Sequence, residues 1–400
     1  MNNGNLLIVG EYPIGYGNGI GETLSNLLET WPDDRIFDMH PERMQPLPGR
    51  GRGRSIPFSW PRPPEWLPAV GRLPYKPLLK IRQAAASREL FRAAAAAIRE
   101  HHIDAVLTYP VTPWILFAAV QLRRAFPDVR FVFYVMDDWE GHHTCFGLPF
   151  TARRRAALAE MIATSDVRFA CSHLMQRDYE RRFATSWNVV HKGVQVPSAL
   201  PARSDRRIWR ILYTGGMNMF RFDAVLAFAE GLRLFREQSG RDVTLTLLGP
   251  EPDAEYAVAL APYSFIRTEP WVDNAMCQQR MTEADFLYLP LSFAPKLERI
   301  THLAMPAKFS EYLASGTPAI FHVPRESEVF ELATQAGLPS TLGTLDPLKI
   351  RDLLFGLNSP AFDETGYQRG ARRLLQDEFD ETVLRLRFHD ACFGDVSRVA

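Results

Sequence analysis

Residues 305–324 read MPAKFSEYLASGTPAIFHVP and predict a short helix, a sharp stop and a buried strand. Pro306 suits the first turn of a helix, and Gly316 followed closely by Pro318 is typical of a helix end. The apolar run 319–323 that comes next fits a strand buried on both faces. Helix, tight turn and core strand in this order are typical of an α/β domain.

Two charged residues interrupt this otherwise apolar unit. Lys308 and Glu311 are three residues apart, so they share one face of the predicted helix. An ordinary surface ion pair at this spacing contributes only about 0.2–0.5 kcal/mol. The stretch alone leaves open whether the two residues form such a pair or part of a site, so the neighbouring sequence has to decide.

Length and composition limit the classes of protein. The 400 residues favour two domains, and 46% hydrophobic against 23% charged residues predicts proper cores. Lys and Arg total 46, as do Asp and Glu, so no overall charge points to nucleic acid as a partner. The four cysteines are scattered without zinc-type spacing, which favours reduced thiols in a cytoplasmic protein.

The apolar runs are too short for a membrane span. The first residues carry no basic segment and only a brief apolar run, which predicts a first strand. No run approaches the ~18–20 apolar residues of a spanning helix. We therefore expect any membrane contact to be peripheral, at the inner face.

The first half opens with a strand, a glycine-rich turn and a helix. A strand over 5–10 is followed by a turn that contains Gly15, Gly17 and Gly19, where free backbone N–H groups can meet an anion. The spacing departs from the dinucleotide fingerprint, and Asp38 is only a loose candidate for a ribose ligand. A dehydrogenase is therefore a weaker alternative.

The same order of elements restarts after a polar linker at 197–207. A strand over 210–213 leads into a turn with Gly215 and Gly216 and then into a helix. Two consecutive α/β halves predict two domains. We expect an N-terminal domain over 1–197, a C-terminal domain over 198–375, and a C-terminal helix in 376–400 that returns to the N-terminal domain, as part of one long helix over about 367–388.

A polar cluster follows the buried strand 130–136. Ligands of open α/β sheets bind beyond the carboxyl ends of the strands, so Asp137, Asp138 and His142 lie where chemistry is expected. They suit a general base or the orientation of sugar hydroxyls. The alternatives are that Asp137 or Asp138 caps the next helix, or, less favoured, that the cluster binds a metal.

Residues 41–82 differ from the rest of the chain. They hold ten of the 30 prolines and nine Lys or Arg against two Glu, a local net charge of +7. Arg50, Arg52 and Arg54 alternate with glycine, and aromatic residues are interleaved. The stretch is either a solvated loop or a surface for peripheral contact with an anionic membrane.

The second half resembles the signature of the group 1, or family 4, glycosyltransferases of the GT-B fold. Four motifs agree in order and spacing: ILYTGGMNMFR (211–221), LTLLGPEP (245–252), EADFLYLPL (283–291) and MPAKFSEYLASGTPAI (305–320). The first half agrees more loosely through its glycine loop, FYVMDDW, FACSHLMQRDY and VVHKGV. The resemblance covers nearly the whole chain, and its last motif is the most specific.

The resemblance implies two Rossmann-like α/β/α domains facing each other across a cleft. The C-terminal domain would bind a nucleotide-diphosphate sugar through Gly215, Gly216, Arg221, Lys308, Glu311 and His302. Glu311 suits the vicinal hydroxyls of a ribose, and Arg221 and Lys308 suit the diphosphate. Fixed cations also stabilise the leaving diphosphate, so neither metal nor other cofactor is expected.

The chain departs from the family pattern at several positions. Leu303 stands where a second glutamate is often found, and Gly216 stands where an arginine is expected. The histidine that the family carries in its N-terminal domain has no clear counterpart, with Asp137 and Asp138 lying nearest. These departures bear on the donor sugar and on the stereochemical outcome.

The expected activity is transfer of a sugar from a nucleotide sugar to a glycan or lipid-linked acceptor, with retention, in polysaccharide or glycolipid assembly. Two alternatives are a nucleotide-sugar epimerase of the same architecture and a non-catalytic protein that binds sugar nucleotides. Turnover of a nucleotide sugar without any acceptor would favour the epimerase.

Overall fold

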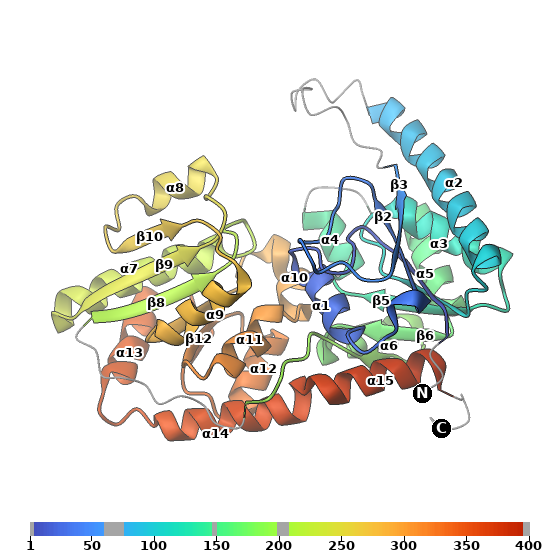
Figure 1. The fold of residues 1–400 in the computed structure, drawn as a ribbon. Coiled ribbons are helices and arrows are strands. Elements are labelled where there is room, and N and C mark those ends of the chain that lie inside the picture. Colours follow the sequence, from blue (N-terminus) through green and yellow to red (C-terminus); the bar gives the residue numbers. More distant parts are fainter. Residues whose placement is uncertain (1–3, 60–75, 146–149, 198–207, 395–400) are drawn as a thin grey trace. The chain divides into compact units, whose positions relative to one another are not determined.

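The computed structural model describes residues 4–59, 76–145, 150–197 and 208–394, with only the backbone for 76–80. The chain divides into two compact units, each built on one sheet (Figure 1). The N-unit comprises Met1–Lys192 together with Thr382–Ala400, and the C-unit comprises Gly193–Glu381.

The N-unit contains a seven-stranded sheet in the order β3-β2-β1-β4-β5-β6-β7, and its neighbouring strands are parallel. Its strands are β1 (Leu6–Val9), β2 (Ile36–Pro41), β3 (Arg54–Phe58), β4 (Ala105–Thr108), β5 (Arg130–Val135), β6 (Val167–Ala170) and β7 (Asn188–Val189). Its helices are α1 (Gly19–Leu27), the 3₁₀ turn η1 (Asp33–Arg35), α2 (Lys76–Glu100), α3 (Pro113–Ala125), α4 (Trp139–Cys145), α5 (Ala152–Thr164), α6 (His173–Phe183) and α15 (Glu381–Phe393).

The C-unit contains a six-stranded parallel sheet in the order β10-β9-β8-β11-β12-β13. Its strands are β8 (Ile208–Thr214), β9 (Asp242–Leu248), β10 (Ile266–Glu269), β11 (Phe286–Pro290), β12 (Ala319–His322) and β13 (Thr341–Leu342). Its helices are α7 (Phe222–Ser239), α8 (Ala254–Leu260), α9 (Asn274–Glu283), η3 (Pro295–Leu297), α10 (Glu298–Leu303), α11 (Ala307–Ser315), α12 (Glu328–Gln335), α13 (Pro347–Asn358), α14 (Glu364–Leu374) and the π turn η4 (Leu375–Phe379).

Both sheets reverse their strand order next to their first strand. The C-unit has the 3-2-1-4-5-6 order of a Rossmann fold, and the first six strands of the N-unit follow the same order. Ligands of such sheets bind beyond the carboxyl ends of the strands at this reversal point. The loops after β1 and β4 in one unit, and after β8 and β11 in the other, are therefore the places to look for a site.

Apolar residues on both faces hold the C-unit sheet. On one face Trp209 stacks on Phe235 of α7 with ring centroids 5.2 Å apart, and α13 packs against the same cluster. On the other face Phe309 of α11 lies among residues of α12, α14 and η4. Burial on both faces explains why the strands are continuous apolar runs.

Helix α15 packs on the N-unit, beside α1 and α6 in Figure 1. Phe388 stacks on Phe169 of β6 with centroids 5.2 Å apart. Arg385 donates a hydrogen bond to the Asn26 carbonyl at 2.8 Å, and Arg130 donates to the Ala391 carbonyl at 2.9 Å. Helix α15, from the end of the sequence, thus belongs to the core of the N-unit.

The predicted single long helix over 367–388 is wrong. Helix α14 ends at Leu374, a π turn follows, and Asp380 is extended before α15 begins. The Val194 N–H donates to the Phe379 carbonyl at 2.8 Å, and the Glu381 N–H donates to the Val194 carbonyl at 3.2 Å. Because another segment binds these backbone groups, the helical ladder is interrupted.

Two further segments differ from the prediction. The sequence predicts Trp271 and Val272 in a strand, but they lie between β10 and α9. Residues 54–58, expected in a loop, form the edge strand β3, which pairs with β2. A proline at an edge is tolerated because its missing N–H faces away from the ladder, and Pro57 lies on this edge strand.

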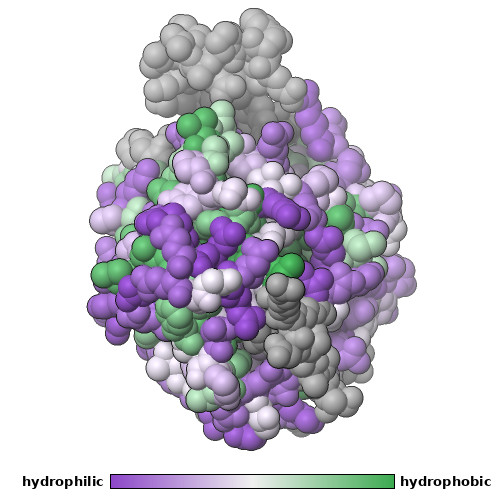
Figure 2. All heavy atoms as spheres, turned by 90° about the vertical axis from the view of Figure 1, so that its left-hand side faces the viewer, coloured by the Kyte–Doolittle hydropathy of each residue, from purple (hydrophilic) through white to green (hydrophobic). Residues whose placement is uncertain are grey.

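The face of the molecule in Figure 2 is mostly hydrophilic, with hydrophobic residues in small separate groups. Within the described residues, no helix combines the length and the apolar character needed to cross a bilayer.

Candidate functional site

A tight glycine turn follows β8 at the reversal point of the C-unit sheet. Gly215 has φ +147°, a conformation that side chains rarely adopt. Its N–H donates to the Leu248 carbonyl at 2.8 Å. A Cβ atom on Gly215 would lie 3.0 Å from Cε of Lys308, so glycine lets the lysine side chain pass close to the turn.

Helix α11 is fixed to this turn by a buried tyrosine. The Tyr312 hydroxyl accepts a hydrogen bond from the Thr214 N–H at 2.9 Å and lies 3.0 Å from the Thr214 hydroxyl. Tyr312 is fully buried, so these bonds are shielded from water. The bonds set the position of the helix that carries Lys308 and Glu311, both of which are half-buried.

Two cations flank the glycine turn. Arg221 stands at the N-cap of α7, near the Tyr213 hydroxyl; burial raises the pKa of Tyr213, and the charge of this arginine opposes the rise. The Tyr213 hydroxyl also donates to the Gly216 carbonyl at 3.0 Å. With Lys308 next to Gly215, the structure brings together four of the predicted residues: Gly215, Gly216, Arg221 and Lys308.

Glu311 belongs to the same cluster through Cys277 of α9. Burial raises the pKa of the Cys277 thiol, Lys308 lowers it, and Glu311 raises it further, so both charges lie near the sulfur. Trp271, with about half of its surface exposed, has its ring centroid 5.9 Å from Nζ of Lys308. Sequence reasoning missed Trp271 and Cys277, although a large aromatic residue just after a strand was a usable signal.

His302 lies in a different environment. Its ring is 3.9 Å from the carboxylates of both Glu298 and Glu326, and burial lowers its pKa while these glutamates oppose that shift. In the described part of the chain it contacts these acids rather than the Lys308 and Glu311 pair. The structure therefore does not join His302 to the cluster.

The N-unit glycine loop packs against residues 47–50. Gly15 has φ +77°, and its carbonyl accepts from the Leu47 N–H at 2.9 Å. A Cβ atom there would collide with the Arg50 carbonyl. At Gly19, by contrast, no described atom lies within 4 Å of such a Cβ, so the opening of α1 is accessible.

The third predicted glycine, Gly17, lies against the Leu47 side chain, where a Cβ atom on the glycine would be 3.5 Å from the leucine methyl groups. The Asn18 side chain caps α1 by accepting from the Gly21 N–H at 2.9 Å. The loop is thus held at both ends and presents the first turn of α1.

Two buried carboxyl groups hold the backbone around this loop. Glu11 accepts from the N–H groups of Val111 and Thr112, and Asp38 accepts from the Ile14 N–H at 2.8 Å. Burial raises the pKa of both groups to about 7, against the effect of these hydrogen bonds. Asp38 therefore supports the loop rather than meeting a ribose.

The two neighbouring aspartates after β5 have different surroundings. Asp138 is buried, accepts from the Gly141 N–H at 2.6 Å, and binds Tyr179 at 3.2 Å and Arg182 at 3.4 Å. It caps α4 and joins it to α6, as the capping alternative predicted. Asp137 is half-buried and lines a pocket.

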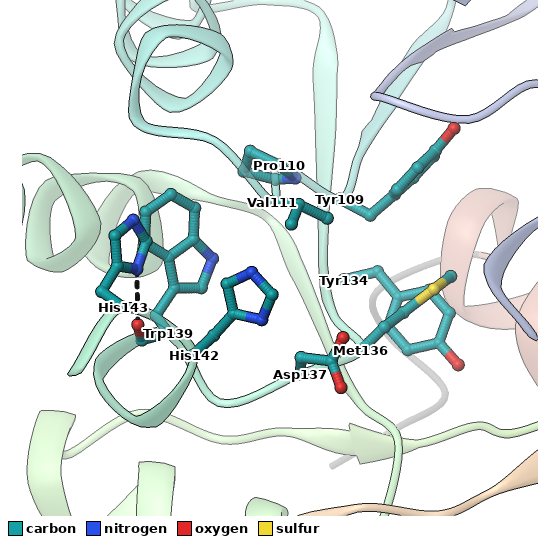
Figure 3. A pocket seen from close by; sticks show the side chains of 9 residues that line it. All are labelled: Tyr109, Pro110, Val111, Tyr134, Met136, Asp137, Trp139, His142 and His143. Carbon is teal, nitrogen blue, oxygen red and sulfur yellow. Dashed lines mark hydrogen bonds between the residues drawn. The ribbon is translucent and has the colours of Figure 1, made fainter. Parts of the chain in front are cut away.

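This pocket contains about 280 Å³ of empty space, part of it open to solvent. In Figure 3 the His142 ring and the Asp137 carboxylate point into the same space, with Trp139 on one side and Tyr134 on the other. His143 is turned aside, because its Nδ1 lies 2.7 Å from the Trp139 carbonyl. The pocket is lined by Tyr109, Pro110, Val111, Tyr134, Met136, Asp137, Trp139, His142 and His143.

The described residues contain no group of three or more His, Cys, Asp or Glu side chains arranged to hold a metal ion.

In the described part of the basic stretch 41–82, two arginines form ion pairs within the N-unit. Arg50 pairs with Glu22, and Arg52 lies 2.6 Å from Asp33. The aromatic residues Trp60, Trp66 and Tyr75 of this stretch lie outside the described residues.

Comparisons with known proteins identify the fold. No family model and no curated protein sequence matches the chain. The N-terminal domain of Candida albicans trehalose-6-phosphate phosphatase is similar in structure, with a TM-score of 0.68, 11% identity, and coverage of 98% of this chain and 97% of that one.

Two further similar structures are complexes with ligands. One is HepE of Anabaena in complex with UDP, with a TM-score of 0.64, 12% identity, and coverage of 96% and 98%. The other is a UDP-forming α,α-trehalose-phosphate synthase of Burkholderia xenovorans in complex with glucose-6-phosphate, with a TM-score of 0.65, 12% identity, and coverage of 98% and 100%. The similarity extends over nearly the whole of each chain, and the chain has the GT-B fold with two Rossmann-like domains.

Proposed function

We propose that the protein is a glycosyltransferase that moves a sugar from a nucleotide-diphosphate sugar to a glycan or lipid-linked acceptor. The observation that carries this proposal is the convergence of Lys308 and Arg221 on the Gly215–Gly216 turn at the carboxyl end of β8. A diphosphate placed there would meet two cations beside the glycine turn. The fold and the UDP complex of HepE support the same class of donor.

The residues of the C-unit cluster would bind different parts of the donor. Lys308 and Arg221 would bind the diphosphate and stabilise the charge that develops when the bond to the sugar breaks. Glu311 would accept hydrogen bonds from the ribose hydroxyls. The exposed Trp271 ring beside Lys308 offers an apolar face to the base.

The N-unit pocket is proposed to hold the acceptor. Asp137 and His142 face into it, while Asp138 positions them by capping α4. We further propose transfer with retention of configuration, in polysaccharide or glycolipid assembly, with side-chain cations in place of a metal. Activity should then be indifferent to a chelator.

Donor binding is tested by a thermal-shift screen of nucleoside mono- and diphosphates and their sugars on four proteins. The proteins are the wild type, Arg221→Ala, Lys308→Ala and the control Arg233→Ala, which removes a partly exposed arginine of α7, the helix that Arg221 precedes. We expect diphosphates to stabilise the wild type and the control alike. Either site variant should weaken binding about tenfold or more, the loss of one charge-assisted contact.

Catalysis is tested with Glu311→Ala and a set of acceptors. Transfer should be lost while the variant keeps its melting temperature. Full transfer by this variant would refute the site assignment. Turnover of a nucleotide sugar without acceptor would instead support an epimerase, and binding without any turnover would support a non-catalytic protein.

We also keep peripheral membrane contact as a proposal for residues 41–82. Since Arg50 and Arg52 pair within the N-unit, the exposed Arg54 is the better candidate for lipid headgroups. Sedimentation with anionic vesicles at low salt should be reduced by Arg54→Ala. No binding of the wild type at low salt would refute this contact.

A further inference from the structure

Trp271 lies just after the carboxyl end of β10, in the segment that leads into α9 (Figure 1). Because the sheet is parallel, this is the same edge of the sheet as the glycine turn after β8. Trp271 is 52% exposed, whereas the next residue, Val272, packs against the core of the C-unit. The carboxylate of Asp273 caps α9 by accepting from the Met276 N–H at 2.8 Å. The segment is therefore anchored directly after Trp271, while the indole ring stays open to a ligand.

Lys308 reaches both this ring and the glycine turn. Its Nζ lies over the indole, 5.9 Å from the ring centroid, and its Cε lies 3.0 Å from the place that a Cβ atom on Gly215 would take. About half of the surface of Trp271 remains exposed with the lysine in this position. In a nucleoside diphosphate only a ribose separates the base from the phosphates. A ligand whose phosphates bind beside Lys308 can therefore place its base on the ring.

Polar side chains close to Trp271 in the sequence are engaged within the fold. Glu269 lies 2.5 Å from Arg280 of α9, and Asp273 caps the same helix. Distinguishing one base from another takes donors and acceptors aimed at the edge of the base. Stacking accepts every base, because every base has a π face. An exposed indole beside side chains that bind one another thus favours recognition of the base by its face.

We propose that Trp271 stacks on the base of the donor nucleotide, so that the site takes purine as well as pyrimidine nucleoside diphosphates and holds the purines more tightly. This inference rests on the proposed function, because it places the base beside the proposed diphosphate site. A purine covers more of an indole ring than a pyrimidine does and buries more apolar surface. Trp271 then sets the affinity for the base, while Lys308 and Arg221 set the affinity for the phosphates.

The test is a calorimetric titration of the full chain with GDP, ADP, UDP, CDP and inorganic pyrophosphate. We expect the wild type to bind all four nucleotides, and the two purines about threefold more tightly or better. Trp271→Ala should weaken the purine nucleotides about fivefold or more, which corresponds to the loss of one stacked base. Pyrophosphate carries no base, so its affinity should stay the same in this variant. Trp271→Phe keeps an aromatic ring and should restore most of the affinity for the nucleotides.

Asn274→Ala is the matched control. It removes an exposed polar side chain from the first turn of α9, three residues after Trp271, and this side chain is of a type that reads base edges. We expect it to change none of the five affinities. A preference for a single base that Asn274→Ala abolishes would show recognition of the edge and overturn the inference.

Three further results would overturn the inference and leave the donor site intact. The wild type binds one nucleotide and none of the other three, or Trp271→Ala keeps the affinities of the wild type for the nucleotides. In the third, Trp271→Ala weakens pyrophosphate as much as the nucleotides, which would show that the ring acts only by positioning Lys308. If the wild type binds none of the five ligands, the proposed function fails together with this inference.

Discussion

At the scale of single residues, Tyr312 links the fold to the donor cluster. Its hydroxyl satisfies the Thr214 N–H directly before the glycine turn. Tyr312→Phe leaves that buried donor without its partner, which costs about 1–3 kcal/mol, and it releases the turn beside Lys308. We expect both a lower free energy of unfolding, measured in urea, and weaker binding of nucleoside diphosphates.

Tyr367→Phe is the matched control for this prediction. The Tyr367 hydroxyl accepts from the Ala319 N–H at 2.9 Å, so the same kind of bond is lost in the same unit at β12. This variant should lose similar stability and keep its nucleotide affinity. Equal nucleotide affinity in the two variants would show that Tyr312 acts on stability alone.

Asp38 predicts a pH dependence of stability. Burial raises its pKa to about 7, above the ~3.9 of an unfolded chain. A folded-state pKa that is raised means that the folded state binds more protons, so the contribution to stability is largest at low pH and is lost as pH rises through 7. The difference is at most about 4 kcal/mol.

Asp38→Asn removes this titration and keeps an acceptor for the Ile14 N–H. The difference in melting temperature, variant minus wild type, should therefore be larger at pH 8 than at pH 5. Asp34→Asn, at an exposed position, should show the same difference from the wild type at both pH values. An Asp38→Asn variant with an unchanged difference at the two pH values would contradict the assignment.

At the scale of elements, the connection between β5 and α4 depends on Asp138 more than on its neighbour. Asp138→Ala removes the cap of α4, the acceptor of the Tyr179 hydroxyl and one of the three carboxylates that Arg182 contacts. We expect a loss of about 2–4 kcal/mol in the free energy of unfolding. Asp137→Ala, one residue away and half-buried, should cost less than about 1 kcal/mol. Equal losses in urea unfolding would argue against the different roles.

The same pair of residues shows how far sequence patterns reach. The apolar run before Asp137 predicted β5, and the position of the cluster at a strand end predicted the pocket. Which aspartate caps α4 depends on Tyr179 and Arg182, which lie about 40 residues further along the chain. The local periodicity of the sequence does not predict contacts between residues so far apart in the chain.

Secondary structure was missed where backbone partners come from distant segments. The helix is interrupted at Asp380 because the Val194 N–H binds the Phe379 carbonyl. Residues 54–58 form β3 because they pair with the edge of β2. In the donor cluster, the motif around Lys308 and Glu311 predicted α11, while Trp271 and Cys277 enter through the tertiary fold. The glycine turn was predictable because its conformation constrains the residue type directly.

At the scale of the whole molecule, two similar sheets differ in how the chain completes them. The C-unit uses consecutive residues, whereas the N-unit takes its last helix from the other end of the sequence. Because the protein has two units, a melting temperature of the whole chain does not tell which unit a substitution destabilises. Local measurements are needed to assign a destabilisation to one unit.

Phe388 tests this arrangement. It is fully buried and stacks on Phe169 of β6. Phe388→Ala should therefore lower the free energy of unfolding by about 3–5 kcal/mol. It should also lower the hydrogen-exchange protection of residues 4–192 and leave that of residues 208–381 unchanged. Leu386→Ala, on the same helix with 43% of its surface exposed, is the control and should change neither region. Mass spectrometry of the exchanged peptides separates the two units. If protection falls in the C-unit peptides instead, α15 contributes to the other core and the division of the chain at residue 381 is wrong.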